Sequence, residues 1–478
     1  MNDQLRQIDI KLTDRVVFLH IPKTAGDTFG ALIDPLLSGL PRCSKTKTGN
    51  LINLPYDEIA QYRLFMGHSS YDQMELLFPS GFLAMTFLRE PIRRTVSQFK
   101  YLQRYEEIQI PIAWKNRDVE LEMIKNMTLD EFVANNTFYD ARMIINLQTR
   151  ILGGVAHKRG EDDHTQSISA RLKKLKNRYD GGDPDEECLE MAKQRLAQVA
   201  FFGITERFQD SLFLLSFTFG WPALIDLLWL NRAPDSHRPT ELDPTTVALI
   251  QEKVNLDIQL YDFAQKLFEQ RFNVMTETLV QKYGNDKHKN LKEPLPANLM
   301  VEFLQKHYET RRDERNLEVL ENIGSSYFYS PASYSEGAFG WYPVDVSPEH
   351  GAMRWSGPEV NAGLDLPLPT GKNIQLSFRV LMALQARIIN ELSVTANGVP
   401  VGLRCETDAR GAFIFTGQIP TQAISGPFVR LVFSVPQTIA PRAIDKNNGD
   451  SRPLGILLNW IKLEGKSSLS RSSLFGKL

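Results

Sequence analysis

The sequence predicts an α/β domain, built on a parallel sheet flanked by helices, followed by an antiparallel β-sandwich. The first part is predicted by two runs of β-branched and aromatic residues, 15–21 and 82–88, each followed by a helix-like segment. The second part is predicted by a change of pattern at residue 325, after which short alternating runs are separated by Gly, Pro, Asn and Asp clusters.

The composition is that of a globular protein. The 478 residues are 42% hydrophobic and 23% charged, and this length suggests two or three domains. With 55 Lys and Arg against 57 Asp and Glu, the formal charge is −2, so no overall basic field favours nucleic acid. A disordered or fibrous chain is excluded, and any anion site has to be local.

We expect neither a signal peptide nor a membrane span in this sequence. Its first fifteen residues lack the apolar core of a signal peptide, and its three cysteines have no C-x-x-C spacing. The apolar stretch 213–230 is interrupted by a glycine, a proline and an aspartate, which favours a buried core segment over a membrane span. We therefore expect a cytoplasmic protein without a transmembrane segment.

The elements of the α/β part alternate between strand and helix. The predicted strands are 15–21, 82–88 and 199–204, and the predicted helices are 24–37 and 92–105, with further helices filling most of 123–272. Because each of the first two strands is followed directly by a helix, the strands should lie parallel in one sheet.

The elements of the second half are a linker, a helix and β-runs. Residues 287–296 predict a linker, 299–320 a helix, and 374–380, 392–396 and 429–435 strands. Asn397-Gly398 predicts a hairpin turn, because both central residues of such a turn need positive φ. The expected boundaries are 1–275 for the α/β domain, 276–324 for a helical linker, 325–466 for the β-sandwich and 467–478 for a flexible tail.

The first strand-to-helix turn, His20-Ile-Pro-Lys-Thr-Ala-Gly-Asp-Thr, predicts an anion site. Free N–H groups and the positive end of the helix dipole attract an anion there, and Lys23 adds a full charge. The turn lacks the GxxxxGK[ST] pattern of a nucleoside triphosphatase loop. An exposed lysine at a helix start is the alternative interpretation of Lys23.

The second turn, Arg89-Glu-Pro-Ile-Arg-Arg-Thr-Val-Ser97, supports the interpretation of the first turn as an anion site. An arginine fork and a hydroxyl suit a phosphate monoester. Two phosphate sites at the carboxyl ends of neighbouring strands indicate one nucleotide that carries phosphates at both ends.

The segments HIPKTAGDTF (20–29) and FLREPIRRTVSQF (87–99) resemble the two signature elements of sulfotransferases that use 3′-phosphoadenosine 5′-phosphosulfate (PAPS). The resemblance is to carbohydrate sulfotransferases of the heparan sulfate 2-O and 6-O type and their bacterial relatives. It spans about residues 14–272 and implies the P-loop-kinase-like sulfotransferase fold. Further matches follow in order at Gly67-His68, Asn146-Leu-Gln-Thr-Arg150, Phe202-Gly-Ile-Thr-Glu206 and Asn255-Leu-Asp-Ile-Gln-Leu-Tyr261.

The resemblance also implies which residues bind the donor. The 5′-phosphosulfate would be held by Lys23, Thr24, Gly26 and Thr28, and the 3′-phosphate by Arg89 and Ser97. Ala25 and Asp27, in the same loop, are also expected to bind the donor. Asp27 departs from the family pattern, which usually has Thr or Ser there, and a carboxylate beside a phosphosulfate is unfavourable unless it points away or pairs with a cation.

Sulfuryl transfer then assigns two catalytic roles. Lys23 would stabilise the leaving phosphate, and His68 would remove the acceptor proton, with a satisfied structural histidine as the alternative for His68. His20 is a second candidate base and, with Arg150, a candidate contact to the substrate. A buried ion pair that fixes its helix is the alternative for Arg150.

We therefore expect a PAPS-dependent carbohydrate O-sulfotransferase that releases 3′-phosphoadenosine 5′-phosphate (PAP) and needs no metal. The acceptor would be a poly- or oligosaccharide or a glycolipid, and the sequence carries no signal for an oligomeric state. Aromatic residues interleaved with polar ones near Trp341 and Trp355 suggest carbohydrate binding by the β-sandwich, with packing in its core as the alternative. The competing functions are an inactive saccharide-binding or scaffold protein and a metal-using kinase or phosphatase, for which no ligand cluster is found.

Overall fold

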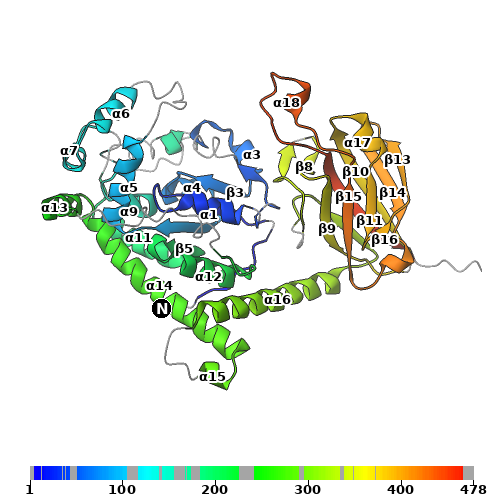
Figure 1. Ribbon diagram of the computed structural model, residues 1–478, viewed down its shortest axis with the longest axis horizontal. Coiled ribbons are helices and arrows are strands. Elements are labelled where there is room, and N and C mark those ends of the chain that lie inside the picture. Colours follow the sequence, from blue (N-terminus) through cyan, green and yellow to red (C-terminus); the bar gives the residue numbers. More distant parts are fainter. Residues whose placement is uncertain are drawn as a thin grey trace, which may run out of the picture. The chain divides into compact units, whose positions relative to one another are not determined.

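The structure is a computed structural model of the chain (Figure 1). It describes residues 5–11, 13–34, 36–37, 39–43, 51–104, 117–138, 141, 143–154, 167, 170–173, 183–225, 242–289, 295–333, 338–347, 349–371 and 373–466. The chain divides into two compact units. The first consists of Met1–Ile33, Cys43–Ala60 and Phe65–Arg311, and the second of Asp34–Arg42, Gln61–Leu64 and Arg312–Leu478.

A five-stranded sheet flanked by helices organises the N-terminal half (Figure 1). Its strands lie in the order β2-β3-β1-β4-β5, and β4 pairs in parallel with both β1 and β5. The strands are β1 Val16–Leu19, β2 Arg42–Cys43, β3 Leu64–Gly67, β4 Leu83–Leu88 and β5 Phe201–Ile204. The predicted parallel sheet and its three predicted strands are confirmed.

Aromatic packing fixes the first helix on this sheet. All residues of β1 and β5 are buried, as expected for strands covered on both faces. Phe29, in α1 (Gly26–Ile33), packs against Phe18 of β1 and Phe87 of β4, with ring centroids 4.9 Å and 4.8 Å away. The start of α1 is thereby held above the ends of these two strands.

Two features differ from the sequence prediction. The pattern did not predict β2 and β3, because strands of two and four residues are too short to establish a period. The first helix ends at Ile33 instead of residue 37. Pro35 follows closely in the sequence, and the residue before a proline is disfavoured in the α conformation.

The rest of the N-terminal half is mainly helical, as predicted. The helices are α3 Tyr56–Ile59, α4 Tyr71–Leu77, α5 Pro91–Gln103, α6 Arg117–Lys125, α7 Leu129–Ala134, α9 Leu147–Gly153, α11 Glu186–Gln198, α12 Phe208–Phe219, α13 Pro244–Lys253, α14 Asn255–Tyr283, α15 Asp286–Lys289 and α16 Ala297–Asn322. The apolar stretch 213–225 begins within the buried helix α12, and 226–230 lies outside the described residues. None of the helices in the described ranges combines the length and the apolar character needed to cross a bilayer.

The C-terminal part contains two antiparallel sheets, which confirms the predicted antiparallel pattern. One has the order β13-β14-β10-β16-β8-β7, with β6 also paired to β16, and the other β12-β11-β15-β9. The strands are β6 Ser326–Tyr329, β7 Asp345–Ser347, β8 Gly351–Trp355, β9 Asn361–Pro367, β10 Asn373–Ala383, β11 Ser393–Ala396, β12 Val399–Pro400, β13 Leu403–Thr407, β14 Phe413–Gln418, β15 Phe428–Ser434 and β16 Ile456–Lys466. A single hydrophobic cluster contains residues of both sheets.

The predicted hairpin turn is also confirmed. Asn397 and Gly398 have φ of 47° and 81°, and they join β11 to β12. The predicted tail 467–478 lies outside the described residues.

Candidate functional site

The loop between β1 and α1 forms the first half of the candidate site. Lys23 and Ala25 have φ of 69° and 64°, a left-handed conformation that is uncommon for residues with a Cβ. Thr24 between them is fully buried, and its hydroxyl donates a hydrogen bond of 2.8 Å to the Ile21 carbonyl. Strain of this kind persists mainly where a loop serves a ligand, and the loop leads into a helix N-terminus that favours an anion.

Gly26, the first residue of α1, is required by the ring of His20. A Cβ atom at this position would lie 2.9 Å from His20 Cγ and closer still to Cδ2 and Nε2. The His20 ring is itself stacked on Phe18 and on His68, with centroid distances of 5.5 Å and 4.6 Å. Since two stacking contacts hold the ring in place, only a glycine lets the loop pass this close to it.

Asp27 and Thr28 lie in the first turn of α1, where Asp27 is exposed and Thr28 is half-buried. An acidic side chain in this turn interacts favourably with the helix dipole. Asp27 also acts on Lys23, because its charge works against the other effects that lower the pKa of the Lys23 ammonium. The unexpected carboxylate is therefore part of the charge balance of the loop.

His68 follows β3, the strand beside β1. Its Nδ1 atom lies 2.8 Å from the backbone carbonyl oxygen of His20. Because a carbonyl oxygen can only accept, this contact places the proton of a neutral His68 ring on Nδ1 and the lone pair on Nε2. The side chain is exposed. The contact thus gives His68 the tautomer that a general base at Nε2 requires.

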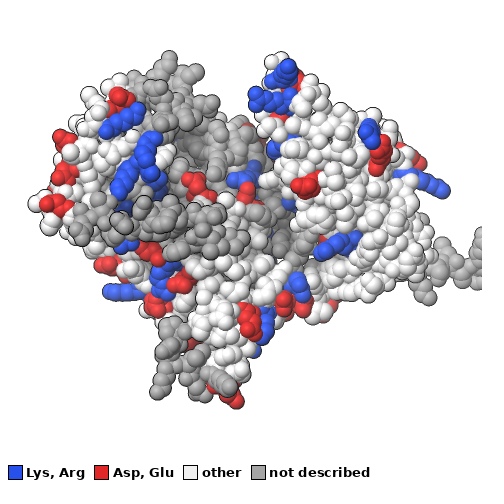
Figure 2. All heavy atoms as spheres, viewed as in Figure 1, with Lys and Arg blue, Asp and Glu red and all other residues white. Residues whose placement is uncertain are grey.

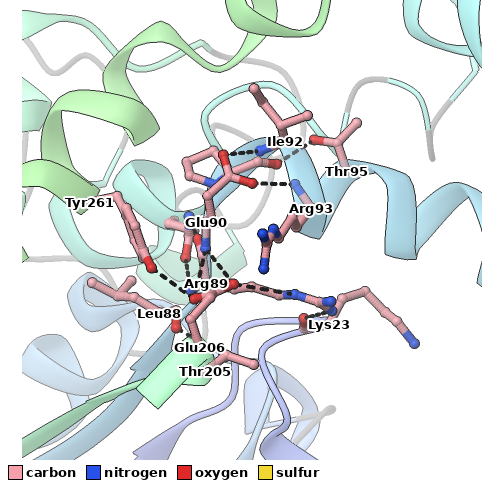
Figure 3. A network of polar contacts seen from close by, with 12 residues as sticks. Lys23, Leu88, Arg89, Glu90, Ile92, Arg93, Thr95, Thr205, Glu206 and Tyr261 are labelled. Carbon is pink, nitrogen blue, oxygen red and sulfur yellow. Dashed lines mark hydrogen bonds and ion pairs between the residues drawn. The ribbon is translucent and has the colours of Figure 1, made fainter. Parts of the chain in front are cut away.

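Arg89 follows β4 and connects the second turn to the first (Figure 3). Its Nη1 donates a hydrogen bond of 3.0 Å to the carbonyl of Lys23. The side-chain amide of Gln148 holds both the N–H and the C=O of Arg89, with two hydrogen bonds of 2.9 Å. The two turns, which are 66 residues apart in sequence, are therefore in direct contact.

The start of α5 is capped by its own sequence. The Glu90 carboxylate accepts hydrogen bonds from the N–H groups of Ile92 and Arg93, over 3.0 Å and 2.7 Å. These N–H groups are consequently engaged, so an anion at the second turn has to be bound largely by side chains. Ser97, which is half-buried, lies two turns further along α5.

Lys23 has an unusual electrostatic environment. Burial and the nearby charge of Arg89 lower its pKa below the ordinary value, and Arg104 contributes in the same direction. Its Nζ lies 4.2 Å from the centre of the Tyr101 ring, a cation–π contact that the sequence analysis missed. The sequence gives only a weak signal for this contact. Tyr101 lies four residues after Ser97 in α5 and therefore on the same face of the helix. Three neighbouring cations favour an anionic ligand at this loop.

The order of the sheet explains why these residues meet. β3 lies on one side of β1 and β4 on the other, so the strand order reverses at β1. Ligands of open parallel sheets bind beyond the carboxyl ends of the strands at such a reversal. His20, His68 and Arg89 each follow one of these three strands. The candidate site is therefore this edge of the sheet.

A network of buried hydrogen bonds holds the second turn at Arg89. Asp257 is fully buried and accepts hydrogen bonds from the N–H groups of Gln148 and Thr149, over 3.1 Å and 2.7 Å. Burial raises the pKa of the Asp257 carboxyl, against the opposing charge of Arg94. Since Gln148 holds Arg89, the sequence elements at 146–150 and 255–261 form the base of the site.

Arg150 differs from the other predicted site residues in its burial and its partners. Its side chain is 2% exposed, its Nη2 donates a hydrogen bond of 3.1 Å to the Ile145 carbonyl, and it lies 3.3 Å from Asp183 Oδ1. The Asp183 side chain is itself 66% exposed, so the ion pair is only partly buried, although it is close to the alternative that the sequence left open.

Charge elsewhere on the molecule is mixed. Figure 2 shows basic and acidic side chains interspersed over the visible face. In the part of the chain that the structure describes, no group of three or more His, Cys, Asp or Glu is arranged to hold a metal ion.

Comparison with known proteins points to one family. The model of the sulfotransferase family matches residues 6–264, which is more than half of the chain. Heparan-sulfate 6-O-sulfotransferase 2 of Gallus gallus is 25% identical over 306 residues, covering 58% of this chain and 72% of that protein. Heparan-sulfate 6-O-sulfotransferase 1 of Homo sapiens is 26% identical over 310 residues, covering 56% of this chain and 68% of that protein.

The solved structures give weaker likenesses. A family 35 carbohydrate binding module from Clostridium thermocellum is 13% identical, with a TM-score of 0.20, and the match covers 30% of this chain and all of that one. A TM-score this low supports no conclusion about the C-terminal part.

Proposed function

Because the chain belongs to the sulfotransferase family, we propose that it transfers the sulfuryl group of PAPS to a hydroxyl of a carbohydrate acceptor. In this proposal the first turn holds the 5′-phosphosulfate and the second turn holds the 3′-phosphate. The P-loop-kinase-like fold of the family is part of the same proposal. The observation that carries the proposal is the hydrogen bond from Arg89 to the Lys23 carbonyl. It unites two anion-binding turns, as a nucleotide with phosphates at both ends requires.

The proposed reaction uses two side chains. His68 Nε2 takes the proton of the acceptor hydroxyl while the oxygen of that hydroxyl attacks the sulfur atom of PAPS. The bond from sulfur to the bridging oxygen of the 5′-phosphate breaks, and the Lys23 ammonium stabilises the negative charge that develops on that oxygen. The products are the sulfate ester, PAP and a proton. No metal ion takes part in the proposed steps.

The names of the relatives support a carbohydrate acceptor, since heparan sulfate is a polysaccharide. We assign the acceptor to the side of the site where His68 is exposed, with His20 as a neighbouring contact. Arg150 is left out of the proposed acceptor site, because its guanidinium is engaged inside the protein.

Carbohydrate binding by residues 325–466 is a further part of the proposal. Trp341 is partly buried and donates a hydrogen bond to the Gly363 carbonyl, and Trp355 is buried, so both tryptophans take part in the packing of this region. Phe328, in contrast, is 58% exposed on β6, and its ring centre lies 6.1 Å from that of Trp460. Such a pair could stack on a sugar ring, and Phe328→Ala in the full chain should then weaken retention on polysaccharide gels.

Transfer of radiolabelled sulfate from PAPS to a panel of desulfated polysaccharides tests the proposal. The wild type should label at least one polysaccharide, and Lys23→Ala and His68→Ala should each lower kcat by roughly 100-fold or more. His68→Ala should bind PAP as the wild type does, because its role is confined to the proton. Lys306→Ala, which removes an exposed lysine of α16, is the matched control and should keep full activity.

Asp27 favours a second candidate, a sulfotransferase-like protein that binds saccharide without turnover. A carboxylate in the donor loop is unfavourable for a phosphosulfate unless its charge is balanced. This candidate predicts retention on polysaccharide gels with no label transferred by the wild type, and restoration of transfer by Asp27→Thr.

A further inference from the structure

Glu206 is a carboxylate that the proposed reaction does not use. It follows β5 in a short 3₁₀ turn, Thr205–Arg207. Its two oxygens lie 3.2 Å and 3.3 Å from the backbone nitrogen of Glu90, which donates to them. The hydroxyl of Tyr261, in α14, donates to Oε2 over 2.8 Å, and Oε1 lies 3.8 Å from Arg89 Nε. Figure 3 shows these groups converging on the carboxylate.

Partial burial and the hydrogen bond from Tyr261 restrict the Glu206 side chain. Its side chain is 21% exposed and that of Arg89 is 27% exposed, so both charges are only partly hydrated. Tyr261 is buried, and burial together with the Glu206 charge raises the pKa of its hydroxyl, which keeps the proton available for donation. A second link joins the same two strand ends, because the Thr205 hydroxyl donates a hydrogen bond of 3.0 Å to the Leu88 carbonyl.

We propose that Glu206, held in place by Tyr261, is a positioning residue for Arg89 and thereby for recognition of the donor's 3′-phosphate. The Glu90 N–H belongs to the peptide directly after Arg89, so the carboxylate fixes the backbone that carries the arginine. Its charge also holds the Nε side of the guanidinium, while the Lys23 carbonyl holds Nη1. The arginine is thus oriented from two directions before a ligand arrives.

Repulsion between the Glu206 carboxylate and the bound phosphate opposes this positioning effect. A carboxylate near a phosphate-binding arginine repels the phosphate and satisfies part of the arginine's charge. The separation of 3.8 Å between Nε and Oε1 is longer than a hydrogen bond, so the guanidinium is restrained without being neutralised. Orientation therefore outweighs repulsion, and removal of the Glu206 charge weakens binding of the 3′-phosphate.

The inference rests on the proposed function, and calorimetric titration of the full chain with PAP and with adenosine 5′-phosphate tests both. The variants are Glu206→Gln, which keeps one acceptor oxygen and loses the charge, and Tyr261→Phe, which loses only the hydroxyl. Glu206→Gln should weaken PAP about tenfold and Tyr261→Phe about threefold, with adenosine 5′-phosphate changed less than about twofold in either. In an Arg89→Ala background, Glu206→Gln should cause no further loss.

Asp210→Asn is the matched control. It removes a carboxylate of the neighbouring helix α12 that pairs with Arg207 over 2.9 Å, and it should leave both affinities unchanged. A merely structural role of Glu206 would weaken both nucleotides together.

Three results would overturn the inference: equal or tighter PAP binding by Glu206→Gln, equal loss for both nucleotides, or a further loss in the Arg89→Ala background. If Glu206→Gln fails to fold, unchanged PAP binding by Tyr261→Phe overturns it instead. Failure of the proposed function is distinguishable, because the wild type itself would then show no preference for PAP over adenosine 5′-phosphate, and the inference would fall with it.

Discussion

Two glycines of α1 should respond in opposite ways to alanine. At Gly26 an added Cβ would lie 2.9 Å from His20 Cγ, and closer to two other ring atoms. At Gly30 the nearest atom would be the terminal methyl carbon of Met66, 3.1 Å away, at the end of a flexible side chain. Two stacking contacts hold the His20 ring, so it yields less easily than the methionine side chain.

The magnitudes follow from these contacts. Alanine in place of glycine stabilises a helix interior by about 1 kcal/mol, and overpacking of a rigid site costs about 1–3 kcal/mol. Gly30→Ala should therefore be neutral or stabilising by about 0.5 kcal/mol, since Met66 adjusts at low cost. Gly26→Ala should be destabilising by about 1–2 kcal/mol, so the two variants should differ by roughly 2 kcal/mol.

Denaturant unfolding and PAP titration check this prediction. Gly26→Ala should also weaken PAP, because Gly26 belongs to the loop proposed to hold the 5′-phosphate, at the start of α1, whereas Gly30→Ala should bind normally. Removal of the ring should relieve the strain, so Gly26→Ala should cost less stability in a His20→Ala background than in the wild type. Gly26→Ala with the stability and PAP affinity of Gly30→Ala would refute the reasoning.

Three further predictions concern charge. Asp27→Thr should tighten PAP roughly two- to fivefold, as expected for removal of an exposed like charge, and unchanged affinity in calorimetry would contradict this. The pKa of Lys23 is lowered by burial and by Arg89, so PAP affinity should fall with rising pH earlier than an ordinary lysine allows, and Lys23→Arg should abolish that fall. Arg195 bridges two carboxylates of α4, at 2.6 Å and 2.8 Å, so Arg195→Ala should lower the free energy of unfolding by about 2–4 kcal/mol. Arg387→Ala, at an exposed helical pair, should lower the free energy of unfolding much less, and equal losses in thermal melts would argue against a stabilising role of the Arg195 ion pairs.

The local parts of the site could be predicted from the sequence. Residues 15–21 and 82–88 are apolar runs that end at turn signals, and Pro91 marks the start of α5 as its fixed φ requires. The hairpin at Asn397-Gly398 followed from the same kind of local preference. Each of these features depends on a few neighbouring residues.

The parts that could not be predicted depend on distant residues. β3 is recognisable only by its position beside β1, and that position supplies the His20 carbonyl that selects the His68 tautomer from 48 residues away. The contact of Glu206 with the Glu90 N–H joins residues 116 apart. No pattern within a short window carries such information, because it arises from the order of the strands.

Titration of the wild type, Lys23→Ala and Arg89→Ala with PAP and with adenosine 5′-phosphate tests most directly that the two turns hold the two ends of one nucleotide. The wild type should prefer PAP at least about tenfold. Lys23→Ala should weaken both nucleotides alike, since both carry a 5′-phosphate, whereas Arg89→Ala should abolish only the preference. Equal affinity of the wild type for both nucleotides, or binding of neither, would contradict the account.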